Sequence, residues 1–201
     1  MLVNTLWRVK LQERAAAARM ARALCVAFGL LLAQMPSQAQ NTSAAPPLPA
    51  TAKAGMPELK VLGAGLLRVL GFRVYNAYLW TPAGSAFDRN KPHALDLQYL
   101  RTLTAKKLAE RSIDEMRGQG VGDDSVYGKW LAEMERVFAD VKQGDRLTGV
   151  VTPARTSKFF FNGAFRREVN DPAFTDAFFG IWLNEKSSQP RLRNQLLGKP
   201  E

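Results

Sequence analysis

The sequence predicts an α+β fold in which a large antiparallel sheet has helices packed on one face. The predicted strands and helices are grouped along the chain rather than alternating, which favours an antiparallel sheet over a parallel one. Asn162 and Gly163 also separate two short apolar stretches, and Asn-Gly is the strongest short-range signal for a two-residue hairpin turn. These two observations carry the fold prediction.

The first 39 residues are typical of a secretory signal peptide. Basic residues precede an apolar run over 23–33, which is too short to cross a hydrocarbon layer of about 30 Å. Ser37 and Ala39 are small residues at the spacing that signal peptidase reads, so we expect cleavage before Gln40. The mature chain is therefore expected to be periplasmic or secreted, without stable membrane insertion. Met20 is an alternative start that would give a shorter signal.

One domain is expected over 57–201, behind a flexible linker over 40–56 that is rich in Ala, Pro, Ser and Thr. Its first strand is predicted over 68–80, where both faces are largely apolar, as in a central strand. Gly71 interrupts this stretch and is expected to weaken the strand or mark a bulge. A second strand is predicted over 94–102.

Two helices follow these strands. Thr104 has the residue type of an N-cap, for a helix that ends near Gly118. Ser125 opens the clearest helix of the chain, because apolar residues recur after it at helical spacing. We expect the two helices to form an antiparallel pair on the sheet.

The C-terminal part alternates short predicted strands with turns before returning to helix. Strands are predicted over 146–152, 157–161 and 164–169. Pro172 follows a capping Asp171, which indicates the first turn of a helix. A last short helix is predicted over 190–197, ending at Gly198.

Composition and motifs exclude several function classes. The net charge is +10, but the basic residues after position 39 are scattered among Asp and Glu without a basic stripe, so we expect no nucleic-acid partner. The only cysteine, Cys25, lies in the signal, which leaves no thiolate chemistry for the mature protein. The only histidine, His93, is expected in a surface turn, with no second residue at metal-ligand spacing. No metal, no cofactor and no catalytic residue is predicted.

Polar side chains on the predicted strands remain as candidates for a site. They are Arg68, Arg73, Tyr75, Asn76, Tyr78, Tyr99 and Arg101. An arginine on a covered strand needs a partner, because an unpaired buried charge is costly. That partner is either a carboxylate of the chain, such as Asp96 or Glu168, or a ligand's carboxylate or enolate.

The order of several segments resembles the chalcone isomerase-like family, in particular its exported bacterial branch. The matching segments, between about 62 and 198, are GAGLLRVLGFRVYNAYLW, DLQYLR, DVKQGD, FFFNG and LRNQLLG. The resemblance implies an open-faced sandwich with a ligand cleft between the sheet and its helices. Some members of that family are intramolecular lyases that close chalcones into flavanones, and others bind fatty acids without catalysis.

Two departures from the family pattern bear on function. The family's arginine follows Gly-x-Gly and one apolar residue, whereas Leu67 holds that position here and arginine comes next, at Arg68. A shift of one residue turns a strand side chain to the other face, unless a bulge restores its direction. No counterpart of the family's catalytic threonine is found near Tyr75. Both departures argue against chalcone cyclisation.

The sequence therefore favours a non-catalytic exported protein that binds a small apolar or carboxylate ligand, such as a fatty acid. The expected polar groups of the cleft are Arg68, Tyr75, Tyr78 and Arg101. Phe72, Trp80 and Trp130 are candidates for its apolar wall, with packing in the core as the favoured alternative for each. Two alternatives stay open. One is an intramolecular lyase with an unknown substrate, and the other is an interaction module of the cell envelope without a ligand site.

Overall fold

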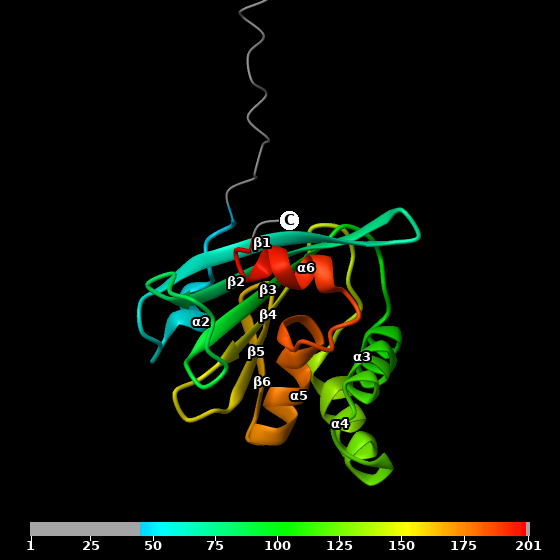
Figure 1. Cartoon of the computed structure of the whole chain (residues 1–201). Coiled ribbons are helices and arrows are strands. Elements are labelled where there is room, and N and C mark those ends of the chain that lie inside the picture. The colour runs from blue at the N-terminus through cyan, green and yellow to red at the C-terminus, as the bar shows by residue number, and fades with distance from the viewer. Residues whose placement is uncertain (1–44, 200–201) are drawn as a thin grey trace, which may run out of the picture. The chain divides into compact units, whose positions relative to one another are not determined.

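A computed structural model of the chain describes residues 45–199. The signal peptide expected over 1–39, with Met20 and Cys25, lies outside these residues. The described part contains one antiparallel sheet whose six strands lie side by side in chain order (Figure 1). The strands are β1 (Leu59–Val69), β2 (Phe72–Pro82), β3 (His93–Tyr99), β4 (Arg146–Val151), β5 (Ser157–Phe161) and β6 (Ala164–Val169).

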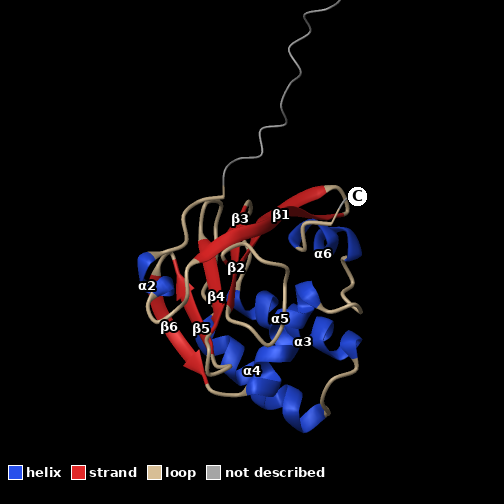
Figure 2. Cartoon of the chain, turned by 60° about the vertical axis from the view of Figure 1, so that its left-hand side comes forward, coloured by secondary structure: helices blue, strands red, loops and turns tan. Residues whose placement is uncertain are grey.

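Three helices cover one face of this sheet, and a short helix lies on the other (Figure 2). The first group contains α3 (Ala105–Gln119), α4 (Asp124–Val137) and α5 (Pro172–Leu183). The short helix is α2 (Ala50–Lys53), and α6 (Pro190–Leu196) packs against β1. This arrangement confirms the predicted α+β sandwich with an antiparallel sheet.

Capping side chains fix where two of these helices begin. The Thr104 hydroxyl accepts a hydrogen bond from the Lys107 amide at the start of α3, as the sequence predicts. The Asp171 carboxylate accepts from the amides of Ala173 and Phe174, at 2.9 and 3.1 Å, immediately before Pro172. Both helices are thereby set at defined positions over the sheet.

The single strand predicted over 68–80 is wrong, because the chain reverses within it. Val69 pairs with Phe72, and the two residues between them have positive φ angles, 50° at Leu70 and 83° at Gly71. This is the backbone pattern of a type I′ hairpin turn, in which Asn-Gly is usual and a leucine is rare. Because leucine is rare in such turns, neither this turn nor the preceding strand β1 is predicted from the sequence.

Part of the predicted linker packs against the sheet. Leu48 and Ala52 are buried in a hydrophobic cluster with Tyr78, Trp80 and Phe160, on the face opposite α3 to α5. Apolar contacts of this kind stabilise a short segment that has no periodic pattern of its own. The linker expected over 40–56 therefore does not extend through residues 48–52.

The larger core lies between the sheet and α3, α4 and α5. Its centre is a group of aromatic rings in which Phe178 contacts Phe159, Phe174 and Trp182 at centroid distances of 5.2 to 5.6 Å. These rings fix α5 against β5. Within residues 45–199, no helix combines the length and apolar character needed to cross a membrane.

Candidate functional site

A pocket of about 450 Å³ lies between the sheet and helices α3 and α5, and we call it the interlayer pocket. This volume falls within the range of roughly 300 to 1,000 Å³ that is usual for small-molecule sites. The side chains that form its apolar wall are Leu67, Val74, Leu97, Leu103, Leu108, Phe138, Leu147, Phe178, Ile181 and Trp182. The pocket thus offers a mainly apolar environment.

Two tyrosines bring hydroxyl groups to this apolar wall. Tyr75 on β2 pairs in register with Tyr99 on β3, and their rings meet edge to face with centroids 5.8 Å apart. The Trp182 indole N–H donates a 2.8 Å hydrogen bond to the Tyr75 hydroxyl oxygen. Neither tyrosine O–H has an acceptor within residues 45–199, so both remain available as donors to a ligand.

Burial keeps both phenols protonated. It raises the pKa of Tyr75 and of Tyr99 well above the ordinary value of 10, because the phenolate would lose its hydration. For Tyr75 the Trp182 hydrogen bond opposes this shift without cancelling it. The two groups therefore act as neutral hydrogen-bond donors at physiological pH.

Cationic side chains line the same pocket. Arg101 follows β3, and its guanidinium carbon lies 5.6 Å from the ring centroid of Phe72. Lys107 and Arg111 stand one turn apart on α3, and Arg111 pairs with Glu115. Three cations against one carboxylate give these four groups a net positive charge. An apolar molecule with an anionic end would be complementary to this distribution.

The structure brings two of the four predicted polar residues together. Tyr75 and Arg101 line the interlayer pocket, whereas Tyr78 and Arg68 do not. Tyr78 follows Tyr75 by three positions, an odd number, so its side chain lies on the opposite face of the strand. It is buried there beside Asp96, and burial raises its pKa, with a further contribution from the Asp96 carboxylate.

Arg68 is exposed and lines a separate depression beside α6. The register of β1 and β2 shifts between Leu67 and Arg68, and Leu67 is the residue that enters the interlayer pocket. The irregularity therefore does not turn Arg68 toward the pocket. At this point of the wall the family's arginine position is apolar.

The carboxylates expected to pair with the strand arginines have other partners. Asp96 is bound by Arg146, at 2.6 Å, and by the Thr148 hydroxyl, at 2.7 Å. Glu168 pairs with Lys158 and accepts a hydrogen bond from Thr156. Within residues 45–199, neither Arg68 nor Arg101 has a carboxylate partner.

The aromatic candidates for the cleft wall do not line the interlayer pocket, and two of them, Trp80 and Trp130, pack in the core as the favoured alternative had it. Phe72 is 65% exposed, and Trp80 is buried on the far face of the sheet. Trp130 belongs to the larger core and donates its indole N–H to Asp171 at 3.0 Å. Sequence reasoning placed these rings by strand and helix periodicity alone, which does not show which side of a sheet faces a cavity.

Three further residues of the pocket, Lys107, Arg111 and Trp182, were not among the predicted site residues. Tyr99 was one of the candidate polar side chains on the strands but was not among the four expected in the cleft. Lys107 and Arg111 carry one available signal, because their spacing of four puts them on the same face of a helix. No comparable signal exists for the Trp182 contact with Tyr75, which joins residues 107 positions apart.

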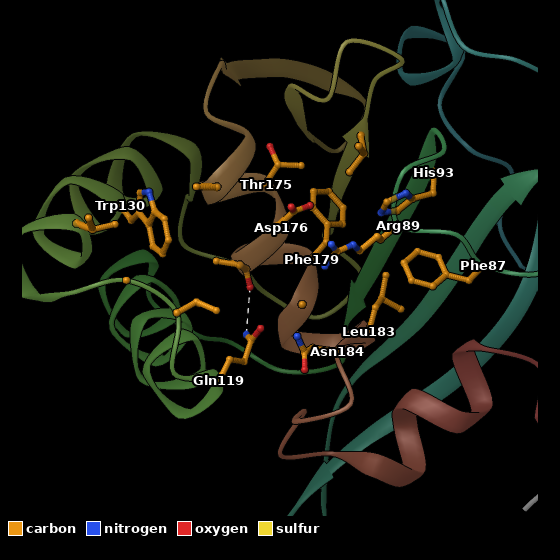
Figure 3. Close-up of a pocket in the computed structure, with 17 residues that line it drawn as sticks. Phe87, Arg89, His93, Gln119, Trp130, Thr175, Asp176, Phe179, Leu183 and Asn184 are labelled. Atoms are coloured by element: carbon orange, nitrogen blue, oxygen red, sulfur yellow. Dashed lines mark hydrogen bonds between the residues drawn. The ribbon is translucent and has the colours of Figure 1, made fainter.

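A second hollow of about 460 Å³ lies beside α5 (Figure 3). His93 lines it and contacts the rings of Phe87 and Phe179 edge to face. With 3% of its surface exposed, His93 is not the surface residue that the sequence predicted. The reason is that it begins β3, where both rings cover it.

Two buried polar side chains of this second hollow, His93 and Gln119, are held by backbone carbonyls. His93 Nδ1 lies 2.8 Å from the Lys91 carbonyl oxygen, and burial lowers the pKa of the imidazole to about 4. Gln119 donates to the Ala177 carbonyl at 3.1 Å, as the dashed line in Figure 3 marks. His93 Nε2 and Gln119 Oε1 lack partners but are both buried under neighbouring atoms. The interlayer pocket is therefore the stronger candidate site.

No group of three or more His, Cys, Asp or Glu side chains within residues 45–199 is arranged to hold a metal ion. The chemistry that the interlayer pocket offers is therefore that of its own donors, cations and apolar surface. It can bind and orient a molecule with a long apolar part and an oxyanion.

One relative and one solved structure show what this chain is similar to. The chain shares 31% identity over 128 residues with an uncharacterized protein of Haemophilus influenzae, covering 64% of this chain and 62% of that relative. The structure resembles a crystal structure of a fatty-acid binding protein from Arabidopsis thaliana, with a TM-score of 0.55 and 11% identity over 72% of this chain and 90% of that one. At such low identity this likeness shows a shared fold.

The sequence profile of the chalcone isomerase-like family matches residues 40–198. The match covers all six strands and the five helices described here. The chain belongs to the chalcone isomerase-like family.

Proposed function

We propose that this protein binds a fatty acid, or a similar apolar carboxylate, in the interlayer pocket without catalysing a reaction. One observation carries the proposal. The hydroxyls of buried Tyr99 and half-buried Tyr75 have no acceptor within residues 45–199, and they line the same apolar pocket as Arg101, which has no carboxylate partner there. Hydrogen-bond donors on an apolar pocket wall are poorly solvated, so an acceptor supplied by a ligand would stabilise them.

A ligand carboxylate would satisfy the two tyrosine donors and pair with Arg101. It could accept from the O–H groups of Tyr75 and Tyr99, while Arg101 neutralises its charge. The alkyl chain would lie among the leucine and aromatic side chains of the wall. Each buried methylene stabilises such a complex by about 0.8 kcal/mol, so affinity should rise with chain length until the pocket is full.

Two further observations support binding rather than catalysis. Leu67 stands in the pocket where the family's enzymes are expected to carry arginine, and Arg68 lies outside it. The structural relative from Arabidopsis is itself described as a fatty-acid binding protein.

Titration calorimetry with saturated fatty acids of increasing length tests this proposal. The protein is the chain from Gln40 onward, which keeps the compact unit 45–201 with both hydrophobic clusters. We expect one site and a gain of roughly fourfold in affinity per added methylene. The absence of binding at every chain length would refute the proposal.

Variants assign the binding to the interlayer pocket. Removing the cation in Arg101→Ala should weaken binding by about tenfold or more, since a hydrogen bond to a charged group is worth roughly 1.5 to 3 kcal/mol. Tyr75→Phe should weaken it less. Tyr78→Phe is the matched control, because this phenol lies on the other face of the sheet. Fatty-acid methyl esters that bind as tightly as the acids would contradict the role assigned to the carboxylate.

We also propose that the protein is exported to the periplasm or beyond the cell. The support is the apolar run and small-residue cleavage site within residues 1–39. N-terminal sequencing of the protein from cell fractions is the test. An extracytoplasmic product that begins at Gln40 is expected, and an uncleaved cytoplasmic chain would contradict the proposal.

A further inference from the structure

The tip of the β1–β2 hairpin exposes apolar side chains to an unusual degree. Leu70 is 92% exposed, Phe72 is 65% exposed and Val69 is 47% exposed. Val69 and Phe72 are cross-strand partners and share one face of the hairpin, with Leu70 at its end. Figure 1 shows the hairpin reaching beyond α3 and α6. Exposed apolar side chains that are contiguous, and rimmed by polar residues, are typical of an interaction site.

The turn is strained in a way that favours a role for its leucine. Leu70 has a φ of 50°, a region that disfavours residues with a branched or bulky side chain. The two-residue turn between β5 and β6 uses Asn162 and Gly163, the residues that relieve this strain. A leucine that is both strained and exposed contradicts local rules, and such departures concentrate at functional positions.

Arginines surround the apolar tip. Arg68 and Arg73 are cross-strand partners next to it, and Arg101 lies over the Phe72 ring. All three are exposed, and none has a carboxylate partner within residues 45–199. Residues 59–87, which contain the whole hairpin, include no Asp or Glu. The tip is thus apolar at its end and positively charged at its base.

We propose that this hairpin docks the protein reversibly on an anionic phospholipid bilayer. Leu70, Phe72 and Val69 would enter the boundary between headgroups and acyl chains, as apolar residues of interfacial segments do. The arginines would remain among the phosphate groups, with their alkyl stems along the apolar boundary. A folded protein partner would need a matching acidic groove, whereas a bilayer supplies both the anionic layer and the apolar layer beneath it.

The hairpin lies at the edge of the interlayer pocket. Val69 and Arg101 also line the interlayer pocket, so the docking surface and the pocket share residues. A docked protein would hold one edge of the pocket against the lipid. The docking itself rests on the hairpin surface alone and does not depend on which ligand the pocket takes.

Vesicle co-sedimentation tests the proposal, using the chain from Gln40 onward and no added fatty acid. We expect binding to vesicles of phosphatidylcholine with phosphatidylglycerol, weaker binding to phosphatidylcholine alone, and a loss of binding as salt rises. The double variant Leu70→Ser with Phe72→Ser should bind at least about tenfold more weakly. Arg68→Gln with Arg73→Gln should reduce binding to the anionic vesicles by a similar factor.

Phe165→Ser is the matched control, since this exposed phenylalanine lies on β6 at the far edge of the sheet. It should bind vesicles like the parent protein. Equal binding by the Leu70 and Phe72 double variant, or no binding to either vesicle, would overturn the proposal. Sedimentation velocity tests a different occupant of this surface, a second copy of the chain. A dimer of the parent protein that is absent in the same double variant would overturn the docking proposal in favour of that second copy. Calorimetry with fatty acids reports separately on the pocket.

Discussion

The indole N–H of Trp182 on α5 donates a 2.8 Å hydrogen bond to the hydroxyl of Tyr75 on β2, across the wall of the interlayer pocket. This bond is the direct polar link between the helix layer and the strand that carries the candidate site. Because its acceptor is also a proposed ligand donor, it holds that hydroxyl in place while leaving the phenol proton free.

We therefore predict a coupling between these two residues in stability. Tyr75→Phe leaves the Trp182 N–H without its acceptor and should cost about 1 to 3 kcal/mol, while Trp182→Phe removes the donor together with some packing. In a double-mutant cycle by urea unfolding, the double variant should lose about 0.5 to 1.5 kcal/mol less than the sum of the two single-variant losses. Additive losses would show that the bond contributes nothing measurable.

The ion pair of Asp96 and Arg146 supports the opposite face of the sheet. Asp96 is fully buried and accepts from Arg146 and Thr148, while the Arg146 side chain is 20% exposed. Arg146→Met would leave the buried Asp96 carboxylate without its cation, and we expect a loss of about 3 to 5 kcal/mol in the free energy of unfolding.

A second ion pair supplies the control for this measurement. Arg155 pairs with Asp176 at a site where both side chains are partly exposed. Arg155→Met should therefore lower the free energy of unfolding by about 1 kcal/mol or less, as expected for a surface pair. This loss is smaller than the one expected for Arg146→Met, which breaks a buried pair. Chemical denaturation of both variants decides this, and equal losses would contradict the argument from burial.

The C-terminal half of the fold could be predicted more fully than the N-terminal half. There, Asn162 and Gly163 mark a turn and Asp171 with Pro172 marks a helix start, and the structure confirms both. These signals are local and act through the backbone. At Leu70 the backbone adopts the same turn without the usual residue, so the hairpin and β1 could not be read from the sequence.

The candidate site could be predicted only in part, for a related reason. Tyr75 and Arg101 were recognisable as polar groups on apolar strands. Placing them in one pocket, and Tyr78 outside it, depends on which sheet face α3 and α5 cover. That choice is made by long-range packing, as in the Phe178 cluster. It has no counterpart in the spacing of residues along one strand.

The buried imidazole of His93 predicts an acid-sensitive fold. Its pKa is about 4 in the folded protein against an ordinary value of 6.5, so below 6.5 the unfolded chain binds more protons than the folded one. Stability should therefore fall as the pH drops from about 6.5 to about 4, by up to about 3 kcal/mol, because one pKa unit corresponds to about 1.4 kcal/mol.

Urea unfolding across this pH range measures the effect, with His93→Phe as the comparison. The variant should show little change between pH 6.5 and 4.5, because its ring does not titrate. The carboxyls with lowered pKa, such as Asp123 and Glu133, also lose stabilisation as the pH approaches their ordinary values of 3.8 and 4.5, and His93→Phe retains that loss, so the difference between the two proteins isolates the histidine. Since His93 is the only histidine, its NMR titration in the parent protein gives an independent check. A midpoint near 6.5 would contradict a buried neutral imidazole.

Stability and membrane docking make opposite demands on Leu70 at the hairpin turn. Leu70 occupies the left-handed region at a position where asparagine is favoured, and it contributes no buried surface. Leu70→Asn should therefore raise the free energy of unfolding by roughly 1 kcal/mol. The reverse change at the equivalent turn, Asn162→Leu, should lower it by at least as much, because the Asn162 side chain also bonds the Arg146 amide and Asp145.

If the docking proposal holds, Leu70→Asn should gain stability and lose vesicle binding together, the trade-off expected where a residue is kept for function. A variant that is more stable and still binds anionic vesicles like the parent would show that the strained leucine is not kept for the membrane.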